Sequence, residues 1–160
     1  MSPYKLSHLP KTLKKLIALF LFVISIGFYN SISFVNHTSG SIQGIQEQYQ
    51  GNEEQEDVEV FKYKKSKSQI MTTVHSHMIS LGMLFFVIAL IVYGTSLPAA
   101  WKSFLMFEPL FSVLFTFSGI YFLWLGYDWF KWIIAISGTL MTLSYSFSII
   151  FIFRDLFFKE

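Results

Sequence analysis

The sequence contains no cysteine and few charged residues. Without cysteine, disulfide bonds, thiol catalysis and thiolate metal sites are excluded. Charged residues make up 14% of the chain, whereas a typical soluble domain carries about 25%. The chain therefore has too little charge to cover a surface that faces water. Its formal net charge of +2 is too small to indicate a nucleic-acid partner.

Long apolar runs take the place of the missing charge. Hydrophobic residues make up 53% of the chain and include nineteen phenylalanines. A membrane-spanning helix needs about 20 mainly apolar residues. Four stretches meet or approach that length, namely 16–35, 70–93, 109–125 and 132–153, and residues 36–69 form the one sizeable polar loop. We expect one all-α membrane domain over residues 1–160, with four transmembrane helices in an antiparallel bundle.

The positions of the basic residues predict the orientation of the chain. Four lysines precede the first apolar run, and cytoplasmic segments carry an excess of lysine and arginine. We therefore expect a multi-pass membrane protein with both termini in the cytoplasm and residues 36–69 outside. A cleaved signal peptide has the same basic start. Because the run is long and no clear cleavage site follows, we expect this helix to be retained.

The second apolar stretch contains the only histidines inside an apolar segment, His75 and His77. In a helix, His75 heads a row of small residues that recurs every seven positions, through Gly82, Ala89 and Ser96. Membrane helices pack along small residues because their backbones can approach closely. His75 is therefore predicted to face the bundle. His77 is rotated by about 200° from it and is predicted to face the lipid.

These histidines are candidate ligands for a metal or a haem. Met71 and Met78 lie one turn either side of His75, and His37 follows the first helix on the same side of the membrane. Imidazole and thioether groups together suit Cu(I) or haem iron. The alternative is that His75 is a hydrogen-bonded packing residue, that His77 lies among the lipid headgroups, and that both methionines only fill space.

Glu108 is the other candidate, because ionisable residues inside membranes are costly. It precedes Pro109, which fits the first turn of a helix, and acidic groups are favoured at helix N-termini. Glu108 is therefore predicted at the cytoplasmic end of the third helix, about 25 Å from the outer histidines across the bilayer core. An alternative is a small ion or solute carrier, with a path from Glu108 through Ser112 and Thr116 towards His75.

The polar loop begins with a predicted short helix. Ile42, Ile45 and Tyr49 are spaced for one helical face, and Gly51 is a natural stop. An acidic block and a lysine-rich block follow. The acidic block includes Glu53, Glu54, Glu56 and Asp57. It is either a solvated loop or a surface that binds a partner or a cation.

Several motifs in the loop and the second helix occur in a recognisable order. They are Gly44-Ile45-Gln46-Glu47-Gln48-Tyr49, Gly51-Asn52-Glu53-Glu54, Lys65-Ser66 and Thr73-Val74-His75-Ser76-His77. Over about residues 40–125 the chain resembles a family of small, uncharacterised bacterial four-helix membrane proteins. Their pattern is G-I-x-E-x-Y-x-G-[ND]-E-E, a lysine-serine step and T-H-x-H, from which this chain departs by the inserted Val74. The resemblance implies an inner-membrane location and supplies no activity.

The sequence predicts no enzyme, because it contains no nucleophile–base arrangement, phosphate-binding loop or carboxylate pair. The leading hypothesis is an accessory or interaction subunit whose working surface is the outer loop with His75 and His77, and whose partners are the lipid bilayer and other membrane proteins. The first alternative is a redox protein that binds copper or haem through His37, His75 and His77. The second is the carrier that uses Glu108.

Overall fold

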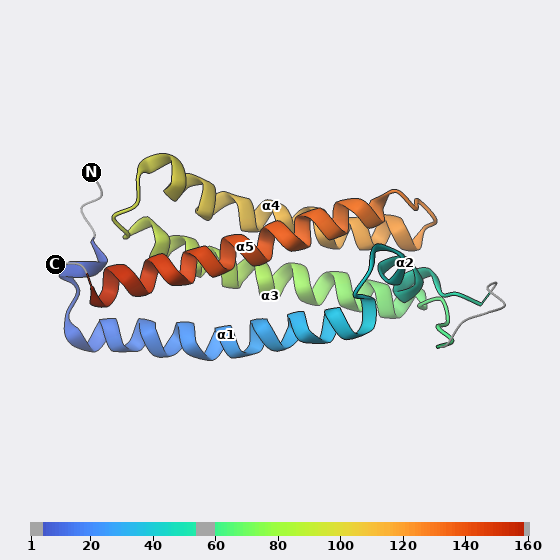
Figure 1. Ribbon diagram of the computed structural model, residues 1–160, viewed down its shortest axis with the longest axis horizontal. Helices are drawn as coiled ribbons and strands as arrows, with labels where there is room; N and C mark the ends of the chain where they lie inside the picture. The colour runs from blue at the N-terminus through green and yellow to red at the C-terminus, as the bar shows by residue number, and fades with distance from the viewer. Residues whose placement is uncertain (1–4, 54–59, 159–160) are drawn as a thin grey trace.

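The structure, a computed structural model, describes residues 5–53 and 60–158. Within these ranges the chain is entirely helical. The elements are η1 (Leu6–His8), α1 (Lys11–Ser39), α2 (Ile42–Gln50), α3 (Lys67–Tyr93), α4 (Ala99–Trp124) and α5 (Phe130–Phe157). Helices α1, α3, α4 and α5 are long and apolar enough to cross a membrane and pack lengthwise in alternating directions (Figure 1). The predicted antiparallel bundle of four transmembrane helices is confirmed.

All four long helices extend beyond their predicted bounds. Helix α1 extends both ends of the predicted 16–35, α3 begins three residues before the predicted 70, and α5 extends both ends of the predicted 132–153. At 1.5 Å per residue the helices are about 39 to 44 Å long. They therefore cross the hydrocarbon core of about 30 Å and reach the headgroups. The short helix predicted from Ile42 to Gly51 is confirmed as α2, with Gly51 as its C-cap.

The largest correction concerns α4, which begins at Ala99 after the N-cap residue Pro98, and not at Pro109. Pro109 lies inside the helix, where it cannot donate a hydrogen bond to the carbonyl of Leu105. Membrane helices tolerate such prolines because neighbouring groups compensate for the lost bond. Figure 1 shows the first turns of α4 inclined to the rest of the helix, as expected for a proline kink. Glu108 therefore lies within the helix and not at its N-terminus.

Helix α4 packs against both α3 and α5. Its approach to α5 is close: a Cβ added at Gly119 would lie 3.0 Å from Cγ1 of Ile134. One turn away, the buried hydroxyls of Thr116 and Ser137 are 2.7 Å apart. Ser137 donates its proton to the carbonyl of Ile133, so Thr116 is the donor to Ser137. Small residues and a satisfied polar pair therefore join α4 to α5.

Helix α1 is peripheral. Of its most apolar window only 11% is buried, compared with 44% for α4. Its main attachment is Phe28, whose ring stacks on Tyr145 of α5 at 4.0 Å and meets Phe85 of α3 edge-on at 6.2 Å. The hydroxyls of Tyr145 and Ser25 are 2.8 Å apart. The hydroxyls of Tyr29 and Ser146 are also close, at 2.9 Å. An aromatic cluster and two hydrogen bonds therefore hold α1 to α5.

We predict that Tyr145→Ala releases α1 while α3, α4 and α5 remain packed. Tyr145 is fully buried, and truncating a buried aromatic side chain typically costs about 3–5 kcal/mol. Spin labels on the introduced cysteines Leu16→Cys and Ile150→Cys would report the distance between α1 and α5 without interference, because the chain has no native cysteine.

The variant should broaden that distance distribution, whereas Tyr127→Ala should leave it unchanged because Tyr127 is 55% exposed. An unchanged distribution in Tyr145→Ala would show that α1 is held by other contacts.

Candidate functional site

Helix α2 and its flanking loop form a cap over one end of the bundle, here named the cap end. Helix η1 and the C-terminal end of α5 lie at the opposite end, here named the terminal end (Figure 1). Gln50 donates hydrogen bonds from Nε2 to the carbonyl of Leu123 at 2.7 Å and to Oδ1 of Asp128 at 2.8 Å. Lys131 donates from Nζ to Oε1 of Gln46 at 2.7 Å. The polar side of α2 is therefore fastened to the α4–α5 turn.

The chain turns back sharply after α2. Gly51 has φ +83°, and a Cβ there would lie 2.6 Å from the backbone nitrogen of Lys64. The buried side chain of Asn52 donates to the carbonyl of Val60 at 2.9 Å and accepts from the N–H of Lys62 at 2.7 Å. Glycine and asparagine at these positions therefore close the loop against itself.

The same loop leads directly into α3. Trp124 donates from Nε1 to the carbonyl of Lys65 at 2.7 Å. Ser66 and Gln69 form a reciprocal capping box that begins α3, which explains why this helix starts before residue 70. The described motif residues of the loop therefore have structural roles, since their contacts shape the cap and begin α3.

The predicted acidic surface is only partly described. Glu53 accepts a hydrogen bond from the N–H of Lys64 at 3.3 Å and so belongs to the cap. Glu54, Glu56 and Asp57 lie outside the described residues. A partner or cation at this block stays a prediction.

We predict that Gly51→Ala destabilises the cap, because the combination of φ +83° and ψ 178° is essentially confined to glycine and costs another residue about 1–3 kcal/mol. The Cβ of alanine would also meet the backbone of Lys64. Amide hydrogen exchange should show faster exchange throughout α2. The control Gly138→Ala should have no such effect, because a Cβ there meets nothing within 4 Å. Equal protection of α2 in both variants would contradict the strain at Gly51.

Ionisation of Tyr49 sets the pH above which the cap loses stability. Its side chain packs against the core beneath α2, and burial raises its pKa from 10.0 to about 12. Because the folded cap disfavours the phenolate, this contribution to stability is complete below pH 10 and is lost between about pH 10 and 12. Titration by phenolate absorbance should show that Tyr49→Phe removes an ionisation near pH 12. Tyr63→Phe should leave that ionisation in place, because the side chain of Tyr63 is 74% exposed and lies outside the buried site.

The structure contradicts the predicted inward face of His75. Both His75 and His77 are exposed on α3, and the ring of His77 also stacks on Phe117 of α4 at 5.0 Å (ring centroids), with its Nδ1 2.9 Å from the carbonyl of Thr73. The buried residues of α3 include the large Phe85, whose ring meets Phe28 of α1 and Tyr145 of α5, and also Ala89 of the predicted row. Gly82, in the same row, has open space around it. Only part of the predicted row of small residues is therefore buried.

The metal ligands predicted from the sequence do not converge. His37 is exposed in the last turn of α1, Met71 is exposed on α3, and Met78 packs against the core. Among the residues that the structure describes, no three histidine, aspartate or glutamate side chains lie close enough to hold a metal ion. The copper or haem site therefore stays a prediction without geometric support.

Glu108 lies on a groove between α4 and α5. The groove has a volume of about 650 Å³ and is lined mainly by apolar side chains. Ser112 donates a hydrogen bond to Oε1 of Glu108, whereas Oε2 is buried and has no hydrogen-bond partner among the described residues. Glu108 lies about 13 Å along the helix from Ala99. It is therefore an intramembrane carboxyl group.

The predicted path from Glu108 is incomplete. Ser112 bonds to Glu108, but Thr116 pairs with Ser137 of α5, and within the described part of the chain no hydrogen bond joins Ser112 to Thr116. His75 faces outward. Along α4, Glu108 is about 13 Å from Phe117, on which His77 stacks. This separation replaces the predicted 25 Å, which assumed that Glu108 began the helix.

Sequence reasoning missed Asn30, whose amide is exposed in the apolar part of α1. Its signal is a polar amide in an apolar run, next to Gly27 and Ser31 at the small-xxx-small spacing of helix contacts. It also missed Ser137 and the groove, which no spacing on α4 alone could show.

The family of the chain follows from comparison with known proteins. Residues 39–160 match the model of a family described as a transmembrane helical domain. The chain belongs to this family. The match begins at Ser39, the last residue of α1, so the family domain comprises α2 to α5 and excludes the peripheral helix. Comparison with curated proteins and with solved structures found no match. The specific motifs and the bacterial origin stay expectations from the resemblance.

Proposed function

We propose that this integral membrane protein is a non-catalytic accessory or interaction subunit of the bacterial inner membrane, and that α1 is the helix that contacts its partner. The observation that carries the proposal is Asn30. Its amide is exposed and makes no hydrogen bond with another described residue. It lies about 13 Å along α1 from Ser39, at a depth where lipid offers no hydrogen bonds.

The surroundings of Asn30 suit a second helix. A Cβ added at Gly27 would meet nothing within 4 Å, and Ser31 bonds back to the carbonyl of Gly27. Both are exposed. Small residues let two backbones approach, and asparagine then bonds across the interface at about 0.6–2 kcal/mol. A partner's transmembrane helix with a polar side chain at this depth would satisfy the amide.

Two features support the rest of the proposal. The family domain begins at the last residue of α1, and α1 contributes only Ile17, Leu21 and Phe28 to the buried core. The exposed His75 and His77, together with the cap, offer a second contact surface at the cap end. Both termini lie in the cytoplasm in this proposal, since more basic residues belong to the terminal end.

We expect a photo-crosslinking amino acid at Phe34, which is 66% exposed one turn from Asn30 on α1, to yield a discrete protein adduct in native membranes. Asn30→Leu should reduce its yield several-fold, because the hydrogen bond is lost. Thr139→Val is the matched control: Thr139 is also exposed, but it already bonds to the carbonyl of Ala135 at 2.8 Å.

The same crosslinker at Ile150, which is 60% exposed on α5, should give no comparable adduct. Lipid adducts alone at position 34, or a yield that Asn30→Leu leaves unchanged, would refute α1 as the contact helix.

A further inference from the structure

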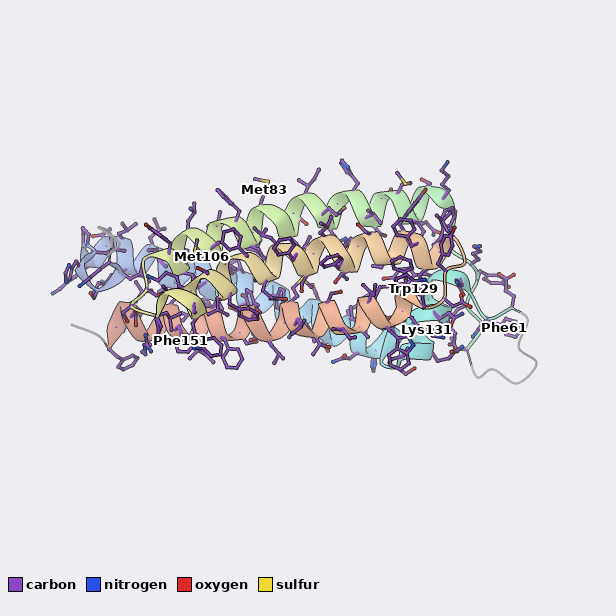
Figure 2. The ribbon with its side chains drawn as sticks, turned by 90° about the horizontal axis from the view of Figure 1, so that it is seen from above. Phe61, Met83, Met106, Trp129, Lys131 and Phe151 are labelled. Atoms are coloured by element: carbon purple, nitrogen blue, oxygen red, sulfur yellow. The ribbon has the colours of Figure 1, made fainter. Side chains whose placement is uncertain are left out.

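The groove at Glu108 combines aromatic walls with an incompletely bonded carboxyl group. Its aromatic lining residues share one face of α4 and are Phe104, Phe107, Phe111 and Phe115. From α5 it is lined by Ile133, Ile136, Ser137 and Leu140. The phenylalanines are about half exposed, so the groove opens sideways to the lipid. Figure 2 shows side chains projecting from this part of α4 and α5.

The carboxyl group of Glu108 has no positive partner in the groove. Ser112 satisfies Oε1, but Oε2 has no hydrogen-bond partner among the described residues. The lining residues include no lysine, arginine or histidine. Because the last side-chain torsion of glutamate is broad, Oε2 can turn into the groove without any change in the backbone.

These features select a positively charged ligand. The faces of aromatic rings attract cations, most strongly where water is excluded, and an ionised carboxyl group in hydrocarbon is stable only beside an opposite charge. The volume of about 650 Å³ falls within the range of small-molecule sites. We propose that the groove binds a lipophilic organic cation that enters from the bilayer, with its charge beside Glu108 and its apolar groups among the phenylalanines.

This inference is independent of the contact proposed for α1, because the groove lies on the α4–α5 side of the family domain. It gives a ligand class to the carrier alternative without requiring the path to His75. A lipid acyl chain would fill the apolar walls but would leave Oε2 unbonded, so it accounts for only part of the site.

The test measures binding of radiolabelled tetraphenylphosphonium to the full-length protein in lipid nanodiscs, with empty nanodiscs subtracted for partition into lipid. We expect saturable binding that falls at least tenfold in Glu108→Gln, which keeps the size of the side chain and its bond to Ser112 but removes the charge. Neutral tetraphenylsilane, of similar shape, should compete poorly. Thermal unfolding of each variant identifies loss of folding.

A matched pair of variants tests the aromatic wall. Phe111→Ala should weaken binding several-fold, whereas Phe86→Ala should not, because Phe86 is similarly exposed but belongs to α3 and is not part of the groove. Binding no greater than to empty nanodiscs, full binding by Glu108→Gln, or equal competition by the neutral compound would each overturn the proposal.

Discussion

Hydrogen bonding inside hydrocarbon is the constraint on which this structure depends. Lipid offers no partner to a polar group, and an unsatisfied group there costs several kcal/mol. The helices meet where their polar side chains find each other: Ser25 with Tyr145 between α1 and α5, and Thr116 with Ser137 between α4 and α5. Because apolar surface alone gives no preference for a neighbouring helix over lipid, these pairs and the close approach at Gly119 define which faces meet.

The two ends of the bundle are built differently from its middle. At the cap end, α2 and the loop satisfy the last turn of α4 through bonds such as that of Gln50 to the carbonyl of Leu123. At the terminal end, Asp155 accepts from the N–H of Ser96 and pairs with Arg154. Placing charged and amide groups at these ends costs less free energy than in the hydrocarbon core, because water and lipid headgroups still solvate them. The motif residues of the loop therefore serve to close one end of the bundle.

The exceptions to the constraint are informative for function. Asn30 exposes an amide to the membrane, and Glu108 retains a carboxyl oxygen that has no partner among the described residues. The hydroxyl of Ser148 likewise lacks a partner in that part of the chain, but it is fully buried and faces no ligand from the bilayer. The first two lie on different helices and suit different occupants, a polar helix for α1 and an organic cation for the α4–α5 groove. Another molecule gains the most binding free energy where it pairs with polar groups that the fold leaves unsatisfied.

The sequence by itself determined that this protein is embedded in lipid and has four long helices, because length and apolar content decide membrane insertion. It also determined the short helix that ends at Gly51, because the residues that end a helix act locally. Tertiary structure alone decided which faces are buried. Residues around each helix are apolar, so the period of the sequence could not show that His75 is exposed or that the ring of His77 stacks on Phe117. Nor could it show that Pro109 lies within α4, since neighbouring helices make such a proline tolerable. In a membrane, the position of the neighbouring helix decides which side chains are buried, and the sequence of a single segment does not encode that position.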